Sequence, residues 1–166
     1  MDQAASPDQL AALAAALEAS WLGTAMRDST VLYPVVNIMH LIGLVLVVGG
    51  IGLLDLRFLG AARHVRVADL YVPLTAAASL GVGLQITTGF PLFASEATTL
   101  ICNTAFRLKM LLLVLALTNA VLFRVLWSRR VADWDNAPPF LGLLQAALSL
   151  MLWVTIGALG RLIAYV

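Results

Sequence analysis

The chain has 166 residues, of which 61% are hydrophobic and 11% are charged, and its net charge is +1. A soluble domain of this length does not bury so large an apolar fraction, so the composition excludes an ordinary soluble fold and indicates a membrane protein. The near-neutral charge argues against nucleic-acid binding. The single cysteine, Cys102, excludes an internal disulfide and a paired-cysteine metal site.

Residues 1–28 predict an amphipathic helix that lies on the membrane surface. Ser6 and Pro7 form a typical helix start, and apolar residues then recur at helical spacing to about Met26. Charged residues near both ends of this segment interrupt it too strongly for a membrane span. We therefore predict an N-terminal interfacial anchor over 1–28 and a transmembrane domain over 29–166.

Four apolar stretches predict four transmembrane helices, because each has about the twenty residues that cross a bilayer core. Their expected limits are about Val31 to Leu59, about Leu70 to Phe93, Asn103 to about Trp127, and Pro139 to near the C-terminus. Asp69 and Asn103 are typical N-cap residues at two of these starts. The predicted fold class is all-α, a transmembrane four-helix bundle with an N-terminal amphipathic interfacial helix.

The charges of the loops predict the orientation of the bundle. The connections after the first and third spans carry Arg57, Arg63, Arg66, Arg124, Arg129 and Arg130, whereas the opposite side carries fewer basic residues and more acidic ones. Basic residues concentrate in cytoplasmic loops. We therefore expect the two termini to lie on the outer side, which is the periplasm for the bacterial inner membrane that the resemblance given below implies, and the lipid bilayer to be the main partner.

Polar residues interrupt the outer half of the spans, where polar groups are costly. Asn37 and His40 share one helical face, and His40 lies roughly 12 Å below the outer boundary at a rise of about 1.5 Å per residue. Residues of the second and third spans reach similar depths. The predicted pocket opens outward and is formed by His40, Asn37, Gln85, Thr88, Arg107 and Met110.

These polar residues also have purely structural interpretations. An intramembrane histidine commonly bridges helices through hydrogen bonds. Lys109 is expected to reach the outer interface as a solvated charge. Asp55 is expected to meet Arg57 or Arg124 near the inner end of the bundle, and Asn119 is expected to form a bond between helices.

Several short motifs extend over nearly the whole chain from Trp21 onward. They are Tyr33-Pro34, Asn37, His40, Thr88-Gly89 with Phe93, Asn103-x-x-Phe106-Arg107-x-Lys109, Asn119 and Gly160-Arg161-x-Ile163-Ala164-Tyr165. In these motifs the chain resembles an uncharacterised bacterial four-span inner-membrane family, which is distantly similar to the CopD copper-resistance membrane domain. The resemblance implies an inner-membrane four-helix bundle. Family members carry a histidine near the end of the third span where this chain has Arg124, which argues against a paired-histidine haem site.

Three functions are compatible with these residues. The first is a haem b or copper site, or electron transfer, with His40 as metal ligand and a methionine (Met39, Met110 or Met151) or a second copy's His40 completing the site. The second is a non-enzymatic subunit that docks a membrane or periplasmic partner or another copy of the chain. The third is a transporter-like pocket for a small ligand or a quinone. Catalysis has the least support and no catalytic residue is predicted, because no nucleophile lies beside a base and no phosphate-binding loop occurs.

Overall fold

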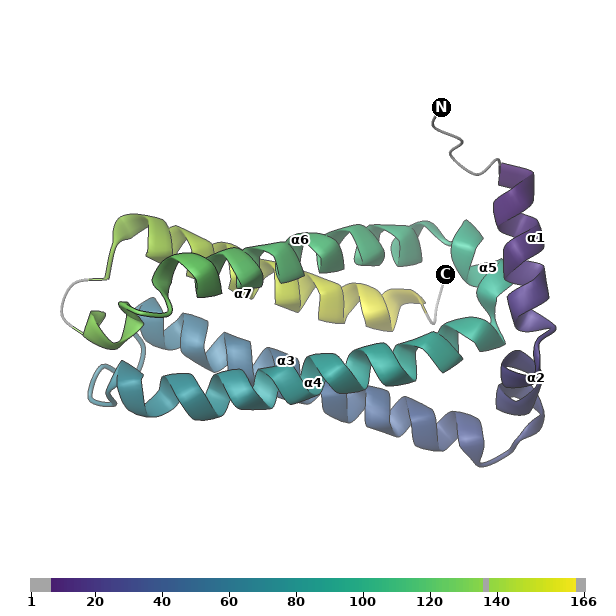
Figure 1. Cartoon of the computed structure of the whole chain (residues 1–166), viewed down its shortest axis with the longest axis horizontal. Coiled ribbons are helices and arrows are strands. Elements are labelled where there is room, and N and C mark those ends of the chain that lie inside the picture. The colour runs from purple at the N-terminus through teal and green to yellow at the C-terminus, as the bar shows by residue number, and fades with distance from the viewer. Residues whose placement is uncertain (1–6, 136–137, 164–166) are drawn as a thin grey trace.

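The computed structural model describes residues 7–135 and 138–163, and this part of the chain contains helices and no strand. Four long apolar helices form a bundle, namely α3 (Leu32–Phe58), α4 (Val67–Ser95), α6 (Thr104–Trp127) and α7 (Phe140–Leu162) (Figure 1). Each is long and apolar enough to cross a membrane. The protein is therefore a multi-pass membrane protein, and the predicted all-α four-helix bundle is confirmed.

The helix boundaries lie close to the predicted ones, with one informative difference. α6 begins directly after Asn103, whose Oδ1 accepts a hydrogen bond of 3.0 Å from the amide of Phe106, as predicted for an N-cap. α4 begins at Val67 instead of Leu70, and Asp69 lies within its first turn. The amide of Val67 donates to the Asp135 carboxylate at 3.0 Å, so a residue distant in the sequence supports this helix start.

The N-terminal segment contains two helices where one was expected, α1 (Pro7–Glu18) and α2 (Trp21–Asp28). Ser20 ends the first and caps the second, because its hydroxyl donates to the Leu17 carbonyl at 2.6 Å and accepts from the Gly23 amide at 3.4 Å. Both helices lie across one end of the bundle in Figure 1, roughly perpendicular to its long axis; this end is named the outer end, and the opposite one the inner end, after the predicted orientation. The short helix α5 (Ala97–Cys102), which the sequence analysis missed, lies against α1.

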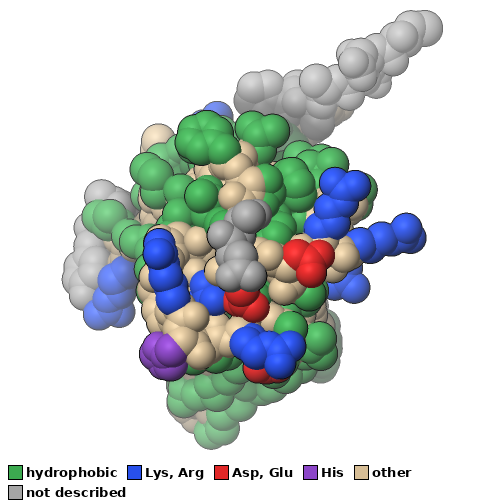
Figure 2. All heavy atoms as spheres, turned by 90° about the vertical axis from the view of Figure 1, so that its left-hand side faces the viewer, with side chains coloured by type: hydrophobic (Ala, Val, Ile, Leu, Met, Phe, Trp, Pro, Cys, Tyr) green, Lys and Arg blue, Asp and Glu red, His purple; other side chains and the backbone are tan. Residues whose placement is uncertain are grey.

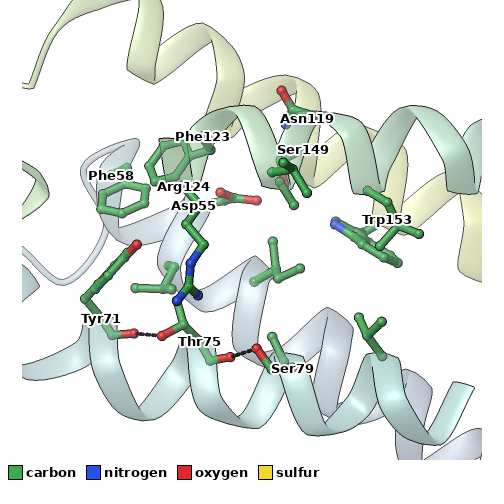
Figure 3. Close-up of a pocket in the computed structure, with 17 residues that line it drawn as sticks. Asp55, Phe58, Tyr71, Thr75, Ser79, Asn119, Phe123, Arg124, Ser149 and Trp153 are labelled. Atoms are coloured by element: carbon green, nitrogen blue, oxygen red, sulfur yellow. Dashed lines mark hydrogen bonds between the residues drawn. The ribbon is translucent and has the colours of Figure 1, made fainter. Parts of the chain in front are cut away.

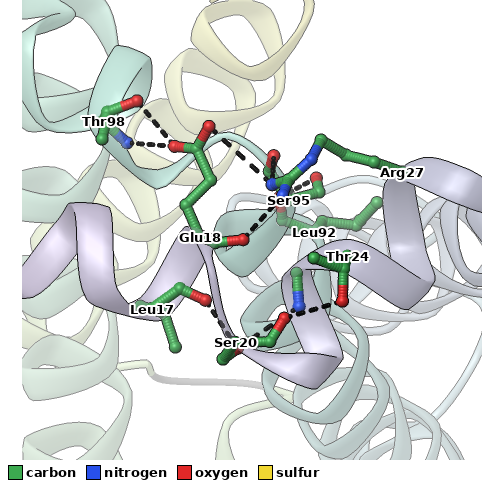
Figure 4. A network of polar contacts seen from close by, with 9 residues as sticks. Leu17, Glu18, Ser20, Thr24, Arg27, Leu92, Ser95 and Thr98 are labelled. Atoms are coloured by element: carbon green, nitrogen blue, oxygen red, sulfur yellow. Dashed lines mark hydrogen bonds and ion pairs between the residues drawn. The ribbon is translucent and has the colours of Figure 1, made fainter.

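A polar network holds this N-terminal segment to the bundle (Figure 4). The Glu18 carboxylate accepts hydrogen bonds from the Thr98 hydroxyl at 2.6 Å and from the Thr98 amide at 2.9 Å. The Arg27 guanidinium donates to the carbonyls of Ser95 at 3.0 Å and Glu18 at 2.8 Å. The hydrogen bonds from Thr98, with a smaller contribution from the Arg27 charge, lower the pKa of Glu18 below its ordinary value.

The bundle consists of two helix pairs that are joined through their inner members. α4 packs along α3, α6 packs along α7, and α3 packs against α7, whereas the backbones of α4 and α6 lie farther apart and these helices meet through side chains such as the Phe93 and Phe106 rings, which stack at 5.6 Å between centroids. Glycines allow the closest approach of the first pair, because a Cβ atom on Gly81 would lie 2.7 Å from the Gly43 carbonyl oxygen. The cavity described below depends on the separation between α4 and α6.

At the inner end of the bundle, an ion pair and a cluster of aromatic rings connect the helices. Arg57 is 4% exposed; its guanidinium donates to Asp135 Oδ1 at 2.5 Å and to the Val65 carbonyl at 2.7 Å. The Phe58 and Trp134 rings pack at 5.1 Å between centroids, next to the short 3-10 helix η1 (Val131–Asp133). Trp134 is therefore buried in the core. Figure 2 faces this end and shows basic side chains distributed around it.

Candidate functional site

The outer-half residues His40, Gln85 and Thr88 lie together between α3 and α4. His40 Nδ1 lies 2.9 Å from Thr88 Oγ1, and the Gln85 side-chain amide donates to the His40 carbonyl at 2.7 Å. The Thr88 hydroxyl donates its hydrogen to the Leu84 carbonyl, so its oxygen is left to accept from His40 Nδ1–H. The unprotonated nitrogen of the half-buried imidazole is then Nε2.

The other three predicted pocket residues lie elsewhere. Asn37 is exposed on α3, and Arg107 and Met110 are exposed on α6. None of the three forms a hydrogen bond with His40, Gln85 or Thr88 within the described residues, and α6 packs on α7 instead of on α3. The structure thus brings together three of the six residues and places the other three on the exposed surface of the bundle.

Lys109 lies near the C-terminal end of α7, and the expectation that it reaches the outer interface stays a prediction. Its side chain is half-buried, and its ammonium lies against α7, where a Cβ atom on Gly160 would be 3.5 Å from Nζ.

The described residues do not supply a complete set of metal ligands around His40. No group of three or more His, Cys, Asp and Glu side chains occurs among them in a position to hold a metal ion. Met39, Met110 and Met151, the candidate second ligands, are all exposed on the outside of the bundle. Within the described part of one chain, His40 Nε2 is therefore the one predicted ligand atom that remains oriented for such a role.

A second polar site lies in the inner half of the bundle, in a cavity of about 220 Å³ between all four long helices (Figure 3). Asp55 of α3 and Trp153 of α7, which are 5% and 3% exposed, both line it. Asp55 Oδ2 and Trp153 Nε1 have no hydrogen-bond partner in the described part of the chain. A buried polar atom without a partner costs about 1–3 kcal/mol, so these two atoms are favourable positions for a ligand.

Three other polar side chains around this cavity, Thr75, Ser79 and Asn119, already have partners. The Thr75 hydroxyl donates to the Tyr71 carbonyl at 2.5 Å, and the Ser79 hydroxyl donates to the Thr75 carbonyl at 2.8 Å, as Figure 3 shows. The Asn119 side chain donates to the Gln145 carbonyl of α7 at 3.2 Å, which confirms the predicted bond between helices. The fully buried side-chain atoms that lack a partner within the described residues are therefore Asp55 Oδ2 and Trp153 Nε1.

Asp55 does not form the ion pair that the sequence suggested. Arg57 pairs with Asp135 instead, and Arg124 lines the same cavity as Asp55 without forming a salt bridge to it within the described residues. The Ser149 side chain of α7 lies near enough to interact with the Asp55 carboxyl group. Asp55 Oδ2 is buried and has no hydrogen-bond partner within the described residues.

The comparisons with known proteins add no relative to this description. No family model, characterised protein or solved structure matches this chain. The candidate function therefore rests on the geometry of the two polar sites, and the resemblance described above stays a prediction.

The sequence analysis did not identify Trp153 or the inner cavity. Ser149 and Trp153 lie one helical turn apart, so they share a face of α7, but a tryptophan in a span usually indicates apolar packing. Asp55 was recognised as a buried acid and assigned to an arginine partner. A stronger signal was available, because an acidic residue so close to an apolar run is a functional candidate by default.

Proposed function

We propose that this membrane protein binds a small hydroxyl-bearing molecule in the inner cavity, between Asp55 and Trp153. The observation that carries the proposal is the pair of unpartnered atoms, a carboxyl oxygen that accepts hydrogen bonds and an indole N–H that donates one. A hydroxyl group satisfies both, because it donates and accepts at the same oxygen. An uncharged ligand is favoured because burying a charge in this apolar surrounding is costly.

The walls and size of the cavity favour an aromatic ring as the body of the ligand. Phe58, Tyr71, Phe123 and Trp153 contribute aromatic side chains to the lining, and aromatic pairs are stabilised by offset or edge-to-face contacts. An apolar cavity of about 150 Å³ accommodates benzene. The volume of about 220 Å³ therefore leaves room for one substituted ring.

Binding of trimethylhydroquinone to the purified protein tests this proposal. We expect calorimetric titration in mild detergent, under anaerobic conditions, to detect binding to the unmodified chain. Trp153→Phe keeps the ring but removes the N–H, so we expect affinity to fall about 3- to 10-fold, the effect of one net hydrogen bond. Trp21→Phe is the control, because Trp21 is exposed outside the cavity.

Two results would overturn the assignment. Absence of binding to the unmodified, folded protein would reject an aromatic hydroxyl ligand for this cavity. Equal affinity of Trp153→Phe and Trp21→Phe would show that the probe binds elsewhere. Asp55→Leu should abolish binding, and its circular-dichroism spectrum would establish that the helices are retained.

A haem or copper role at His40 is the second candidate. It is supported by the hydrogen bond between His40 Nδ1 and Thr88, because such a bond fixes the ring and leaves Nε2 for a ligand. A second copy of the chain would have to supply the missing ligand. Absorption spectra of the oxidised and dithionite-reduced protein, together with metal analysis, test this role. His40→Ala should remove the cofactor. Full retention of the cofactor by this variant would refute the assignment.

We also propose that the basic end of the bundle faces the cytoplasm of a bacterial inner membrane and that both termini are periplasmic. The exposed arginines at that end, Arg63, Arg66, Arg129 and Arg130, support this orientation. A C-terminal alkaline phosphatase fusion should then be active, whereas a fluorescent fusion protein at the same site should stay dark; the reverse pattern would invert the orientation. Docking of a partner protein through residues 1–28 stays a prediction.

A further inference from the structure

The residues that line the inner cavity differ in exposure between the helices α3 and α7 and the helices α4 and α6. Its floor comes from α3 and α7, where Leu54, Asp55, Ser149 and Trp153 are all buried. Among the described lining residues, the exposed ones lie on α4 and α6, namely Ser79, Val121 and Arg124. The cavity therefore extends from the centre of the bundle to its surface between α4 and α6.

The arrangement of the helices explains this opening. α4 packs on α3 and α6 packs on α7, and the backbones of α4 and α6 lie farther apart, although the Phe93 and Phe106 rings stack between them at the end of the bundle away from the cavity. In Figure 3 the Arg124 side chain extends from α6 toward α4, which carries Tyr71, Thr75 and Ser79. Small side chains contribute to the gap, because Ala78, Ser79 and Ala120 line it where larger residues would fill it.

The opening lies at the depth of the lipid hydrocarbon. Val121 is six residues before the inner end of α6 and Ser79 is twelve residues after the inner start of α4, which correspond to about 9 and 18 Å along the helices. The hydrocarbon core is about 30 Å thick. Exposed Val121 and the exposed apolar residues around it make this a surface for lipid tails, so the mouth of the cavity faces the inner leaflet.

We infer that the cavity takes its ligand sideways from the bilayer, and that this ligand is a hydroxylated aromatic ring with a long apolar tail. The ring lies between Asp55 and Trp153, and the tail leaves the bundle between Ser79 and Val121 into the lipid. This inference rests on the proposed function and adds the ligand class and the route of access. A tail in lipid loses no hydrophobic stabilisation, whereas the polar ring gains two partners inside the bundle.

Competition between probes in lipid nanodiscs tests the inference. Radiolabelled trimethylhydroquinone reports occupancy of the cavity, and the same ring carrying a decyl tail is the competitor, both kept anaerobic and compared with empty nanodiscs. We expect the tailed ring to displace the labelled one. Val121→Trp places a bulky side chain at the mouth and should weaken displacement by the tailed ring at least tenfold relative to Leu122→Trp.

Leu122 is the matched control because it is exposed at the same depth of α6 but does not line the cavity. If the labelled ring binds and the tailed ring does not displace it, the cavity is closed to the bilayer and the inference is wrong while the proposed function stands. If the labelled ring itself does not bind, the proposed function fails. Equal displacement in the two tryptophan variants would also overturn the lateral route.

Discussion

Replacement of Asp135 is the sharpest test of how the inner end of the bundle is held together. Its Oδ1 atom accepts hydrogen bonds from the Arg57 guanidinium at 2.5 Å and from the Val67 amide at 3.0 Å. One carboxylate thus connects the end of α3, the start of α4 and the segment before α7. In Asp135→Ala, the hydrogen bond to the Val65 carbonyl is the one that remains to the Arg57 guanidinium within the described residues.

The magnitude follows from the burial of the two partners. Removal of one member of a buried ion pair costs about 3–5 kcal/mol. The Arg57 side chain is 5% exposed but the Asp135 side chain is 28% exposed, so water compensates part of the loss. We therefore expect Asp135→Ala to lower the free energy of unfolding by about 2–3 kcal/mol, which corresponds to a decrease in melting temperature of about 4–12 °C.

Thermal unfolding in detergent, followed by circular dichroism, measures this effect. Asp133→Ala is the control, because it removes a nearby exposed acid for which no side-chain bond is recorded within the described residues. Asp135→Asn should fall between the two, since its amide oxygen still accepts one hydrogen bond without the charge. Equal melting temperatures for the alanine variants at positions 135 and 133 would refute the argument that this pair stabilises the inner end.

Three further predictions concern other parts of the bundle. Gly81→Ala should lower the free energy of unfolding by about 1–3 kcal/mol, because the added Cβ would clash with α3. Gly83 has open space around it, so Gly83→Ala should be neutral or slightly stabilising. Equal melting temperatures of the two variants would contradict the packing of α4 on α3. Asp55→Leu should raise stability by about 1–2 kcal/mol while abolishing probe binding, and a lower melting temperature would indicate a structural role instead. Because the folded-state pKa of Glu18 lies below its ordinary 4.5, its stabilisation is complete above pH 4.5 and is lost as the pH falls through the lowered pKa. The melting-temperature difference between the unmodified chain and Glu18→Gln should therefore disappear on acidification, and a difference that stays constant with pH would contradict this assignment.

The two polar sites show how far sequence reasoning reaches. The depths of His40, Gln85 and Thr88 along their spans were sufficient to predict that they meet, because α3 and α4 are consecutive antiparallel helices in close contact. Arg107 and Met110 have comparable depths but lie on the other helix pair. Depth along a span is a local quantity, whereas the rotation of each helix about its axis depends on its neighbours.

The sequence by itself determined the membrane location and the four spans, because hydrocarbon tolerates long apolar helices and few other structures. It also determined local features such as the N-cap at Asn103, which depends on residues within one helical turn. The tertiary structure alone decided that Arg57 pairs with Asp135, 78 residues away, and that Asp55 consequently keeps a free oxygen. The same is true of the cavity, since its opening exists because α4 and α6 each pack on a different partner. Pair choice among several arginines and acids depends on three-dimensional distance and burial, which the order of residues does not specify.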